Sequence, residues 1–185
     1  MSQQSNPEYV GKSFASIMVV AVTSDDLLRR SYEDRIVALL AKRGKKGIPA
    51  YDAVGTRGKV EEAQLRQALE KAGVDGVLIT RVTSVERSSG TVPGSTVAVG
   101  IGYSVGPGWG GFYGFYDGVW QTVEVPPEQI LGPKWTASET RLFDARNGAL
   151  AWTGVVDTRQ SDDFAAALTQ YINVIFDAMV NDRVL

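Results

Sequence analysis

The chain has 185 residues and a net charge of -2, and 44% of its residues are hydrophobic, as in an ordinary globular protein. It contains no histidine and no cysteine, which excludes cysteine nucleophiles, Ser-His-Asp triads and ordinary zinc sites. No basic face of the kind that binds nucleic acid and no apolar run of about 18 residues is present, so we expect no nucleic-acid partner and no membrane-spanning helix. Two glycine motifs that resemble nucleotide-binding loops fail by spacing or context, so we also expect no cofactor.

The first 13 residues are polar and are interrupted by Pro7 and Gly11. This composition predicts a flexible amino-terminal tether over residues 1–13. The remaining residues, 14–185, are enough for one α/β domain with its own core. We therefore expect a single domain that follows a tether.

The clearest strand signal is the apolar run at residues 17–22, which ends in Thr-Ser-Asp-Asp. A short run of this kind, rich in valine, predicts a strand that is buried on both faces of a sheet. A helix is expected next, with Asp25 and Asp26 at its start and Gly44 at its end. Its predicted buried stripe is Leu28, Tyr32, Ile36, Leu39 and Leu40.

Residues 48–54 predict a second strand, which Pro49 would place at an edge of the sheet. Residues 60–72 predict a second helix with an apolar stripe, ended by Gly73. The apolar residues 77–82 then predict a third strand. An order of strand, helix, strand, helix and strand is typical of parallel strands joined by right-handed crossovers.

An insertion rich in glycine and aromatic residues is expected at about residues 94–120. One interpretation is an irregular excursion whose aromatic side chains pack back on the domain. Another is an aromatic surface for protein contacts, with the candidate residues Trp109, Phe112, Tyr113, Phe115, Tyr116 and Trp120. A third is a membrane-inserting hairpin over residues 96–125, against which the acidic Asp117 and Glu124 argue.

The last third of the chain predicts an antiparallel hairpin and a helix. Residues 135–143 and 149–158 are rich in β-forming residues, and Asn147-Gly148 between them is a strong hairpin signal. The final helix starts after Asp163, and its stripe is Phe164, Leu168, Tyr171, Ile172, Ile175, Phe176, Met179 and Val180. The fold class is therefore α/β, leaning toward α+β: a mixed sheet of about five to six strands with a βαβαβ first half, an antiparallel hairpin and a carboxy-terminal helix.

A family resemblance is carried by a first strand, a helix, a second strand, a Gly/Tyr-rich middle and a hairpin. Their motifs are Ser16-Ile-Met-Val-Val-Ala-Val, Tyr32-Glu-Asp with Leu39-Leu-Ala-Lys-Arg-Gly, Gly73-Val-Asp-Gly-Val-Leu-Ile-Thr-Arg, and Glu139-Thr-Arg-Leu-Phe-Asp-Ala-Arg-Asn-Gly-Ala-Leu-Ala-Trp. With their layout, the chain from Ser16 to Leu185 resembles small envelope lipoproteins of Gram-negative bacteria, most of them of unknown function. The architecture is similar, more loosely, to the amino-terminal domain of the Tol-Pal translocation protein. It is also similar to the penicillin-binding-protein activator lipoproteins and to the periplasmic domain of the curli-secretion channel lipoprotein.

The resemblance implies export to the periplasm, removal of a signal peptide and a lipid anchor in the outer membrane. The sequence has no cysteine to carry that lipid, so the anchor would have preceded Ser2. The resemblance also implies an interaction module of the cell envelope, with an envelope protein as its partner and no catalysis. The oligomeric state follows from none of these features.

The residues alone leave two other classes of function open. One is a small-molecule-binding protein or an enzyme, with a site at the carboxyl ends of the parallel strands near Thr23, Ser24, Thr80 and Arg81. The other is an oligomeric channel component that uses residues 96–125 as a hairpin.

Overall fold

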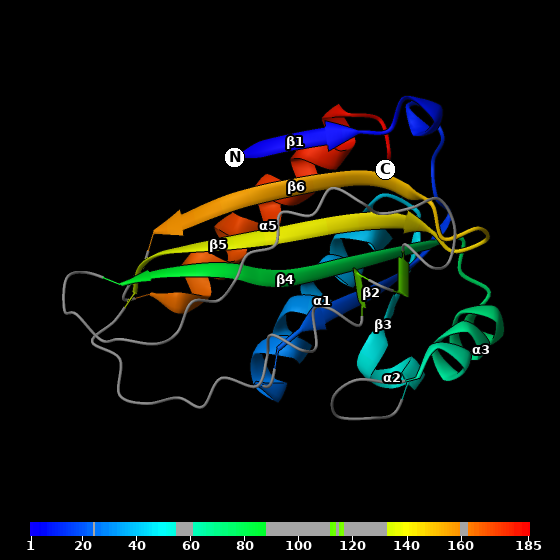
Figure 1. Ribbon diagram of the computed structural model, residues 1–185, viewed down its shortest axis with the longest axis horizontal. Helices are drawn as coiled ribbons and strands as arrows, with labels where there is room; N and C mark the ends of the chain where they lie inside the picture. The colour runs from blue at the N-terminus through cyan, green and yellow to red at the C-terminus, as the bar shows by residue number, and fades with distance from the viewer. Residues whose placement is uncertain (24, 55–60, 88–111, 114, 117–132, 160–162) are drawn as a thin grey trace.

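The computed structural model describes residues 1–23, 25–54, 61–87, 112–113, 115–116, 133–159 and 163–185. They include six strands of one mixed sheet and four α-helices (Figure 1). The strands are β1 (Ser2–Ser5), β2 (Ser16–Val22), β3 (Lys46–Pro49), β4 (Gly76–Arg87), β5 (Pro133–Asp144) and β6 (Leu150–Arg159). The helices are α1 (Asp26–Lys42), α2 (Ala50–Val54), α3 (Glu62–Ala72), α5 (Phe164–Asn181) and the 3₁₀ helix η1 (Pro7–Tyr9). The predicted α/β fold class is confirmed.

The strand order in the sheet is β1-β6-β5-β4-β2-β3. β2 lies between β3 and β4 and is parallel to both, whereas β4, β5, β6 and β1 pair antiparallel. The β5–β6 hairpin turns at the predicted Asn147-Gly148, where Gly148 adopts a φ of 71° in the left-handed region. The sequence thus predicted the parallel half and the hairpin correctly.

The predicted second strand is only partly correct. β3 is an edge strand, as Pro49 indicated, but it ends at that proline, and residues 50–54 form the short helix α2. The N–H of Tyr51, in the first turn of α2, donates to a buried carboxylate of α1 at 3.1 Å. The N–H of Tyr51 therefore has a hydrogen-bond partner on α1 and needs none on a neighbouring strand. Residues 48–54 alone could not predict this bond, because its acceptor lies on another element.

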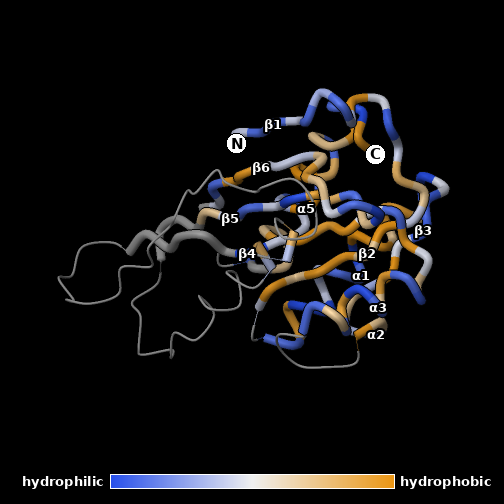
Figure 2. Tube along the Cα trace, turned by 45° about the vertical axis from the view of Figure 1, so that its right-hand side comes forward, coloured by the Kyte–Doolittle hydropathy of each residue, from blue (hydrophilic) through white to orange (hydrophobic). Residues whose placement is uncertain are grey.

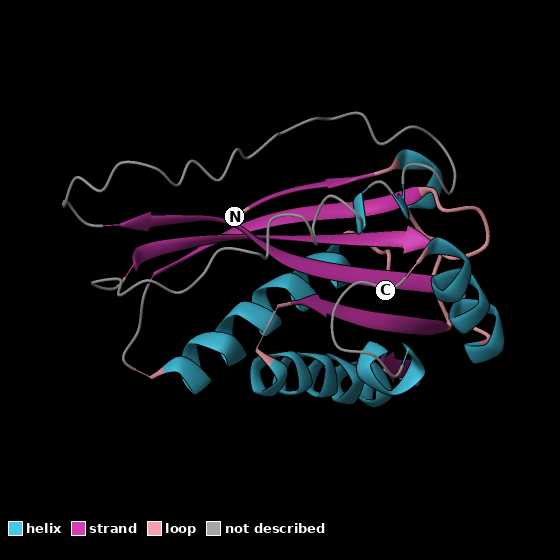
Figure 3. Ribbon diagram, turned by 60° about the horizontal axis from the view of Figure 1, so that its bottom comes forward, coloured by secondary structure: helices cyan, strands magenta, loops and turns pink. Residues whose placement is uncertain are grey.

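Two hydrophobic cores lie on opposite faces of the sheet. α1 and α5 supply the first core, and α3, residue Ala50 and three aromatic residues of the segment 112–116 supply the second. Figure 3 shows the two long helices together beneath the sheet. β2 is buried at every position and gives Ile17 and Val19 to the first core and Met18 and Val20 to the second. Figure 2 shows the apolar stretch along this strand.

The amino-terminal residues differ from the predicted tether. β1 pairs antiparallel with β6, with Ser2 opposite Val155 and Ser5 opposite Trp152. The side chain of Tyr9 is buried, and its hydroxyl donates to Asp144 Oδ2 at 3.2 Å. In this structure Ser2 to Tyr9 are therefore folded onto the sheet, in place of the free tether that the composition predicted. Strands at the edge of a sheet pair through their main-chain N–H and C=O groups. Polar residues carry these groups too, so a polar segment can form an edge strand.

Candidate functional site

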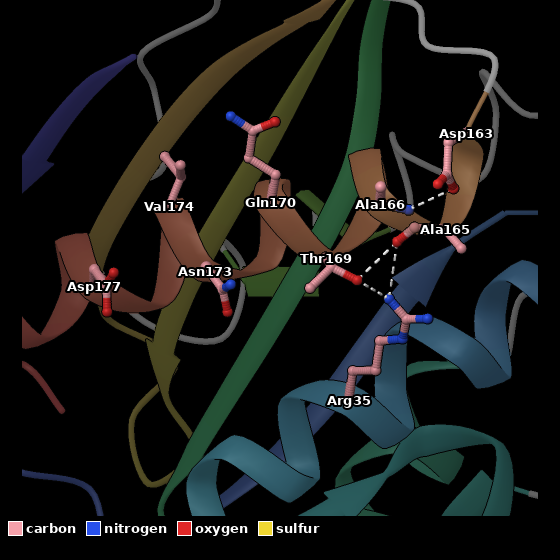
Figure 4. A pocket seen from close by; sticks show the side chains of 9 residues that line it. All are labelled: Arg35, Asp163, Ala165, Ala166, Thr169, Gln170, Asn173, Val174 and Asp177. Atoms are coloured by element: carbon pink, nitrogen blue, oxygen red, sulfur yellow. Dashed lines mark hydrogen bonds between the residues drawn. The ribbon is translucent and has the colours of Figure 1, made fainter.

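An open groove runs along the exposed side of α5 and is closed on one flank by Arg35 of α1 (Figure 4). Its volume is about 560 Å³. Its surface is mainly apolar, with polar groups between, and it is lined by Arg35, Asp163, Ala165, Ala166, Thr169, Gln170, Asn173, Val174 and Asp177. The opposite side of α5 holds the part of the predicted apolar stripe that runs from Leu168 to Val180, so the groove uses the half of the helix that the core leaves exposed.

Arg35 fixes the flank of the groove. Its Nη1 donates to the main-chain oxygen of Ala165 at 3.2 Å and to Oγ1 of Thr169. The Thr169 hydroxyl donates to the same Ala165 oxygen at 2.7 Å. At the start of the helix, Asp163 accepts the N–H of Ala166 at 2.9 Å. These bonds tie the first turns of α5 to α1 and give the groove a defined wall.

The chemistry of the groove suits hydrogen bonding to another chain. Thr169, Asn173 and Asp177 recur every four residues along one line of the helix, and Gln170 lies on a neighbouring line. Asparagine and glutamine each offer both donors and acceptors, and the carboxylates of Asp163 and Asp177 outnumber the guanidinium of Arg35. A partner with hydrogen-bond donors or basic side chains would complement this surface.

The aromatic residues that the sequence proposed for protein contacts lie elsewhere than expected. Phe112, Phe115 and Tyr116 are members of the second core, with exposed fractions of 1%, 9% and 3%. Tyr113 is half-buried and packs against the same core. In this structure these side chains therefore pack back on the domain, as one interpretation of the insertion expected, and a protein-contact surface formed by the insertion stays a prediction. Trp109 and Trp120 lie outside the described residues, as does most of the 94–120 insertion.

A cluster of charges holds Phe115 on the sheet. Glu139 is buried, and its Oε2 accepts two N–H groups of Arg81 at 3.0 and 2.8 Å while its Oε1 accepts Nε of Arg141 at 2.7 Å. The guanidinium carbons of Arg81 and Arg141 lie 4.7 and 4.1 Å from the centroid of the Phe115 ring. Each arginine thus pairs with one carboxylate oxygen and stacks on the same ring, so this cluster clamps the segment 112–116.

Of the residues proposed at the strand ends, Thr80 is part of a buried chain of hydroxyl groups. Its Oγ1 lies 2.6 Å from the hydroxyl of Tyr32 and 2.8 Å from Oγ1 of Thr140, which lies 3.0 Å from the hydroxyl of Tyr171. The chain links α1, β4, β5 and α5 through the first core. Thr80 and Arg81 therefore bond to other core residues, Thr23 is half-buried, and Ser24 lies outside the described residues.

The hydroxyl chain is kept neutral by its surroundings. Burial raises the pKa of Tyr171 to about 12 and raises the pKa of Tyr32 well above its ordinary value. Neutral hydroxyl groups can both donate and accept, so four of them can form a continuous chain without an ion. Its role is to join the two long helices to the sheet at one defined register.

We expect Thr140→Val to lower the free energy of unfolding by about 1–3 kcal/mol, because Tyr171 and Thr80 each lose a buried hydrogen-bond partner. Urea unfolding measures the change. Thr153→Val makes the same chemical change on β6, where the side chain is half-buried, and should cost less than about 0.5 kcal/mol. Equal costs for the two variants would show that the hydroxyl chain adds no stability.

Glu33 is the buried acid that the sequence analysis missed. Its side chain is 0% exposed; Oε1 accepts the N–H of Ala21 at 3.0 Å and Nε of Arg29 at 3.2 Å, and Oε2 accepts the N–H of Tyr51. Burial raises the pKa of this carboxyl, although the two N–H groups and the Arg29 guanidinium oppose the rise. One carboxylate thus joins α1, β2 and α2.

Glu33 occupies the position that a longer β3 would take beside the end of β2. Lys46 donates to the oxygen of Ala15 and Asp75 donates to the oxygen of Ser16, so odd-numbered residues of β2 bond on the β3 side. Ala21 has that parity, but β3 ends opposite Val19. The carboxylate of Glu33 takes the place of the missing strand. The sequence does indicate that Glu33 faces the core, because Arg29, Glu33, Ile36 and Leu40 recur at helical spacing and so share one face of α1.

Among the described residues, no three acidic side chains come close enough to hold a metal ion. Within the same part of the chain, no helix is long and apolar enough to span a membrane.

Comparison with solved structures finds chains that align over most of their length at low identity. The crystal structure of lipoprotein GNA1162 from Neisseria meningitidis covers 90% of this chain and 99% of its own, at 18% identity and a TM-score of 0.46. A PelC dodecamer from Paraburkholderia phytofirmans covers 100% of this chain and 98% of its own, at 13% identity and a TM-score of 0.49. The hypothetical protein CT253 from Chlamydia trachomatis covers 89% and 95%, at 10% identity and a TM-score of 0.39.

No protein-family model matches the sequence, and no curated protein matches it. A lipoprotein is thus among the structures that this chain is similar to. At these identities and TM-scores the similarity assigns neither a partner nor a location. The looser likeness to the Tol-Pal and penicillin-binding-protein activator domains stays a prediction.

Proposed function

We propose that this protein is an interaction module of the bacterial cell envelope, held in the periplasm by an amino-terminal lipid in the outer membrane, and that it acts by binding another envelope protein and not by catalysis. The sequence resemblance to small envelope lipoproteins supports the location. The open groove along α5 supports binding, because Arg35 flanks it and its lining offers amide and carboxylate groups beside apolar surface.

The shape of the groove is the observation that carries the proposal. Small-molecule sites enclose most of their ligand among apolar side chains. This groove is open, and its lining includes four exposed polar residues of one helix: Thr169, Gln170, Asn173 and Asp177. An open surface that combines apolar area with polar groups is suited to a protein interface, whose partner would bring apolar contacts together with hydrogen-bond donors and basic groups.

Palmitate labelling tests the location. When the protein is expressed from its native start codon in a Gram-negative host, we expect it to incorporate labelled palmitate and to fractionate with the outer membrane. A cytoplasmic product without label would contradict the envelope assignment.

Site-specific crosslinking tests the groove. A photoreactive residue in place of Asn173 should crosslink to one envelope protein in living cells, and the same residue in place of Gln67 should not, because Gln67 is exposed on α3 over the other core. Gln170→Arg should then reduce the crosslink from position 173 by on the order of tenfold, since it adds positive charge and bulk to the groove.

Gln67→Arg is the matched control, because it makes the same change on an exposed helix position outside the groove. It should leave the crosslink intact. If both arginine variants preserve it, or if positions 67 and 173 crosslink equally, the groove is not the binding surface.

A further inference from the structure

β1 is attached to the sheet without apolar packing. Ser2, Gln3 and Gln4 are exposed and Ser5 is half-buried. The strand is held by its main-chain pairing with β6 and by side-chain bonds to one residue, Asp182. An element with so little buried apolar surface opens locally far more easily than the core beneath it.

Asp182 recognises the side chains of β1 at alternate positions. It lies at the end of α5, where its carboxylate accepts Nε2 of Gln3 at 2.9 Å and Oγ of Ser5 at 3.0 Å. Nε1 of Trp152 on β6 donates to the same carboxylate at 2.7 Å. Gln3 and Ser5 are two residues apart, so they project from the same face of the strand. The edge of β6 therefore offers main-chain hydrogen bonds to an added strand, and the carboxylate of Asp182 beside it accepts hydrogen bonds from that strand's side chains.

The attachment beyond β1 is firmer. The N–H of Asn6 donates to the oxygen of Ala151 at 2.9 Å, its side-chain amide donates to the oxygen of Leu150 at 3.0 Å, and Tyr9 is buried in the first core. Residues 2–5 can therefore leave β6 while Asn6 and Tyr9 stay in place, and their departure frees the edge opposite Trp152 to Val155.

We propose that the free edge of β6 is a strand-addition site that the chain's own β1 occupies in this structure. The occupant that it fits is an extended segment of a partner protein with hydrogen-bond donors, such as serine, glutamine or lysine, at two alternate positions facing Asp182. β1 itself is the template for that chemistry. The partner segment displaces β1 by adding contacts that Ser2 to Ser5 do not make. This proposal does not rest on the groove along α5.

Hydrogen exchange on the unmodified protein is the first test. The bond from Asn6 to Ala151 places alternate residues of β6 toward β1, so the amides of Thr153 and Val155 face β1 and those of Trp152 and Val156 face β5. We expect Thr153 and Val155 to exchange on the order of 100-fold faster than Trp152 and Val156. Equal rates in the two sets would mean that β1 opens only with the whole domain, and the proposal would fail.

The second test uses a synthetic peptide and an engineered disulfide that can be formed or reduced. Gln4 and Thr153 are paired residues on β1 and β6, so cysteines at both positions can form a disulfide that holds β1 in place. The probe is the synthetic peptide Ser-Gln-Gln-Ser-Asn-Pro with a nitroxide at its amino terminus, at millimolar concentration because it competes with a tethered strand. Paramagnetic broadening of the Val155 amide signal should appear in the reduced protein and disappear in the oxidised protein.

Asp182→Ala tests the specificity of the edge. The reduced protein should bind the peptide more tightly than the analogue Ser-Ala-Gln-Ala-Asn-Pro, by on the order of tenfold, and Asp182→Ala should remove that difference. No broadening in the reduced protein, or equal broadening in both redox forms, would overturn the proposal. Gln170→Arg should leave peptide binding unchanged. The strand-addition site can therefore be tested independently of the groove along α5.

Discussion

Glu33→Ala should lower the free energy of unfolding by about 3–5 kcal/mol, the largest effect that we expect for a single side chain of this protein. The substitution removes the acceptor of two main-chain N–H groups, those of Ala21 and Tyr51, and the carboxylate oxygen that accepts Nε of Arg29. Urea unfolding followed by circular dichroism measures the loss as a lower midpoint with an unchanged slope.

Asp34→Ala is the matched control for this prediction. Asp34 is the next residue of α1 and is also acidic, but it is exposed and accepts the hydroxyl of Tyr51, at 2.5 Å. Its removal should cost less than about 1 kcal/mol. If both variants have the same stability, the buried carboxylate does not act as the substitute for a missing strand.

The raised pKa of Glu33 also sets the sign of its pH dependence. Burial makes the folded state bind the proton more tightly than the unfolded state does. The contribution of this group to stability is therefore greatest at low pH and decreases as pH rises from the ordinary range of a glutamate to the raised value, beyond which it is constant. Glu33→Gln should remove this decrease from the curve of stability against pH, and an unchanged curve would contradict the assignment.

Gly154→Ala should cost about 1–3 kcal/mol, because a Cβ at this position would overlap Cη2 of Trp152 and would lie 3.0 Å from Cζ2 of the same ring. The Trp152 ring is 0% exposed and passes over Gly154 within the first core, while its Nε1 donates to Asp182. The ring is thus held at both ends and has little freedom to move away. Thermal or urea unfolding measures the loss.

A double-mutant cycle separates this clash from a general effect of alanine in β6. Trp152→Leu removes the outer ring atoms, so Gly154→Ala in that background should be neutral or slightly stabilising. The two substitutions should therefore be coupled by about 1–3 kcal/mol. Thr153→Ala, one residue away on the other face of the strand, should show no coupling to Trp152→Leu. Additive costs at residues 152 and 154 would rule out the steric explanation.

The order and type of most elements are local properties of the sequence. The valine-rich run of β2, the edge position marked by Pro49, the Asn147-Gly148 turn and the apolar stripe of α5 all predict what the structure shows. Each depends on residues that are close together in the chain, on a periodicity or on a backbone preference. The fold class follows from them because strands and helices with one apolar face can be layered in few ways.

The contacts that define the sites depend on residues far apart in the chain. The register of β4 against β5 places Arg81 beside Glu139, and the end of β3 leaves the N–H of Ala21 for Glu33. Neither register nor strand length is written in a local pattern, so the sequence could not show which charges would meet. The groove depends in the same way on how α1 packs beside α5 and brings Arg35 to Thr169.

The first residues and the aromatic insertion show the same division most clearly. Ser2 to Ser5 have no strand pattern and nevertheless form β1, since pairing at an open edge uses the main chain, which is the same for every residue. Phe112 and Phe115 looked available for a partner and are buried, because Phe143 and two arginines of the sheet receive their rings. By itself the sequence determined the elements and their order. Only the tertiary structure decided which polar groups and which aromatic faces remain free, because that choice is made by the neighbours that folding brings together.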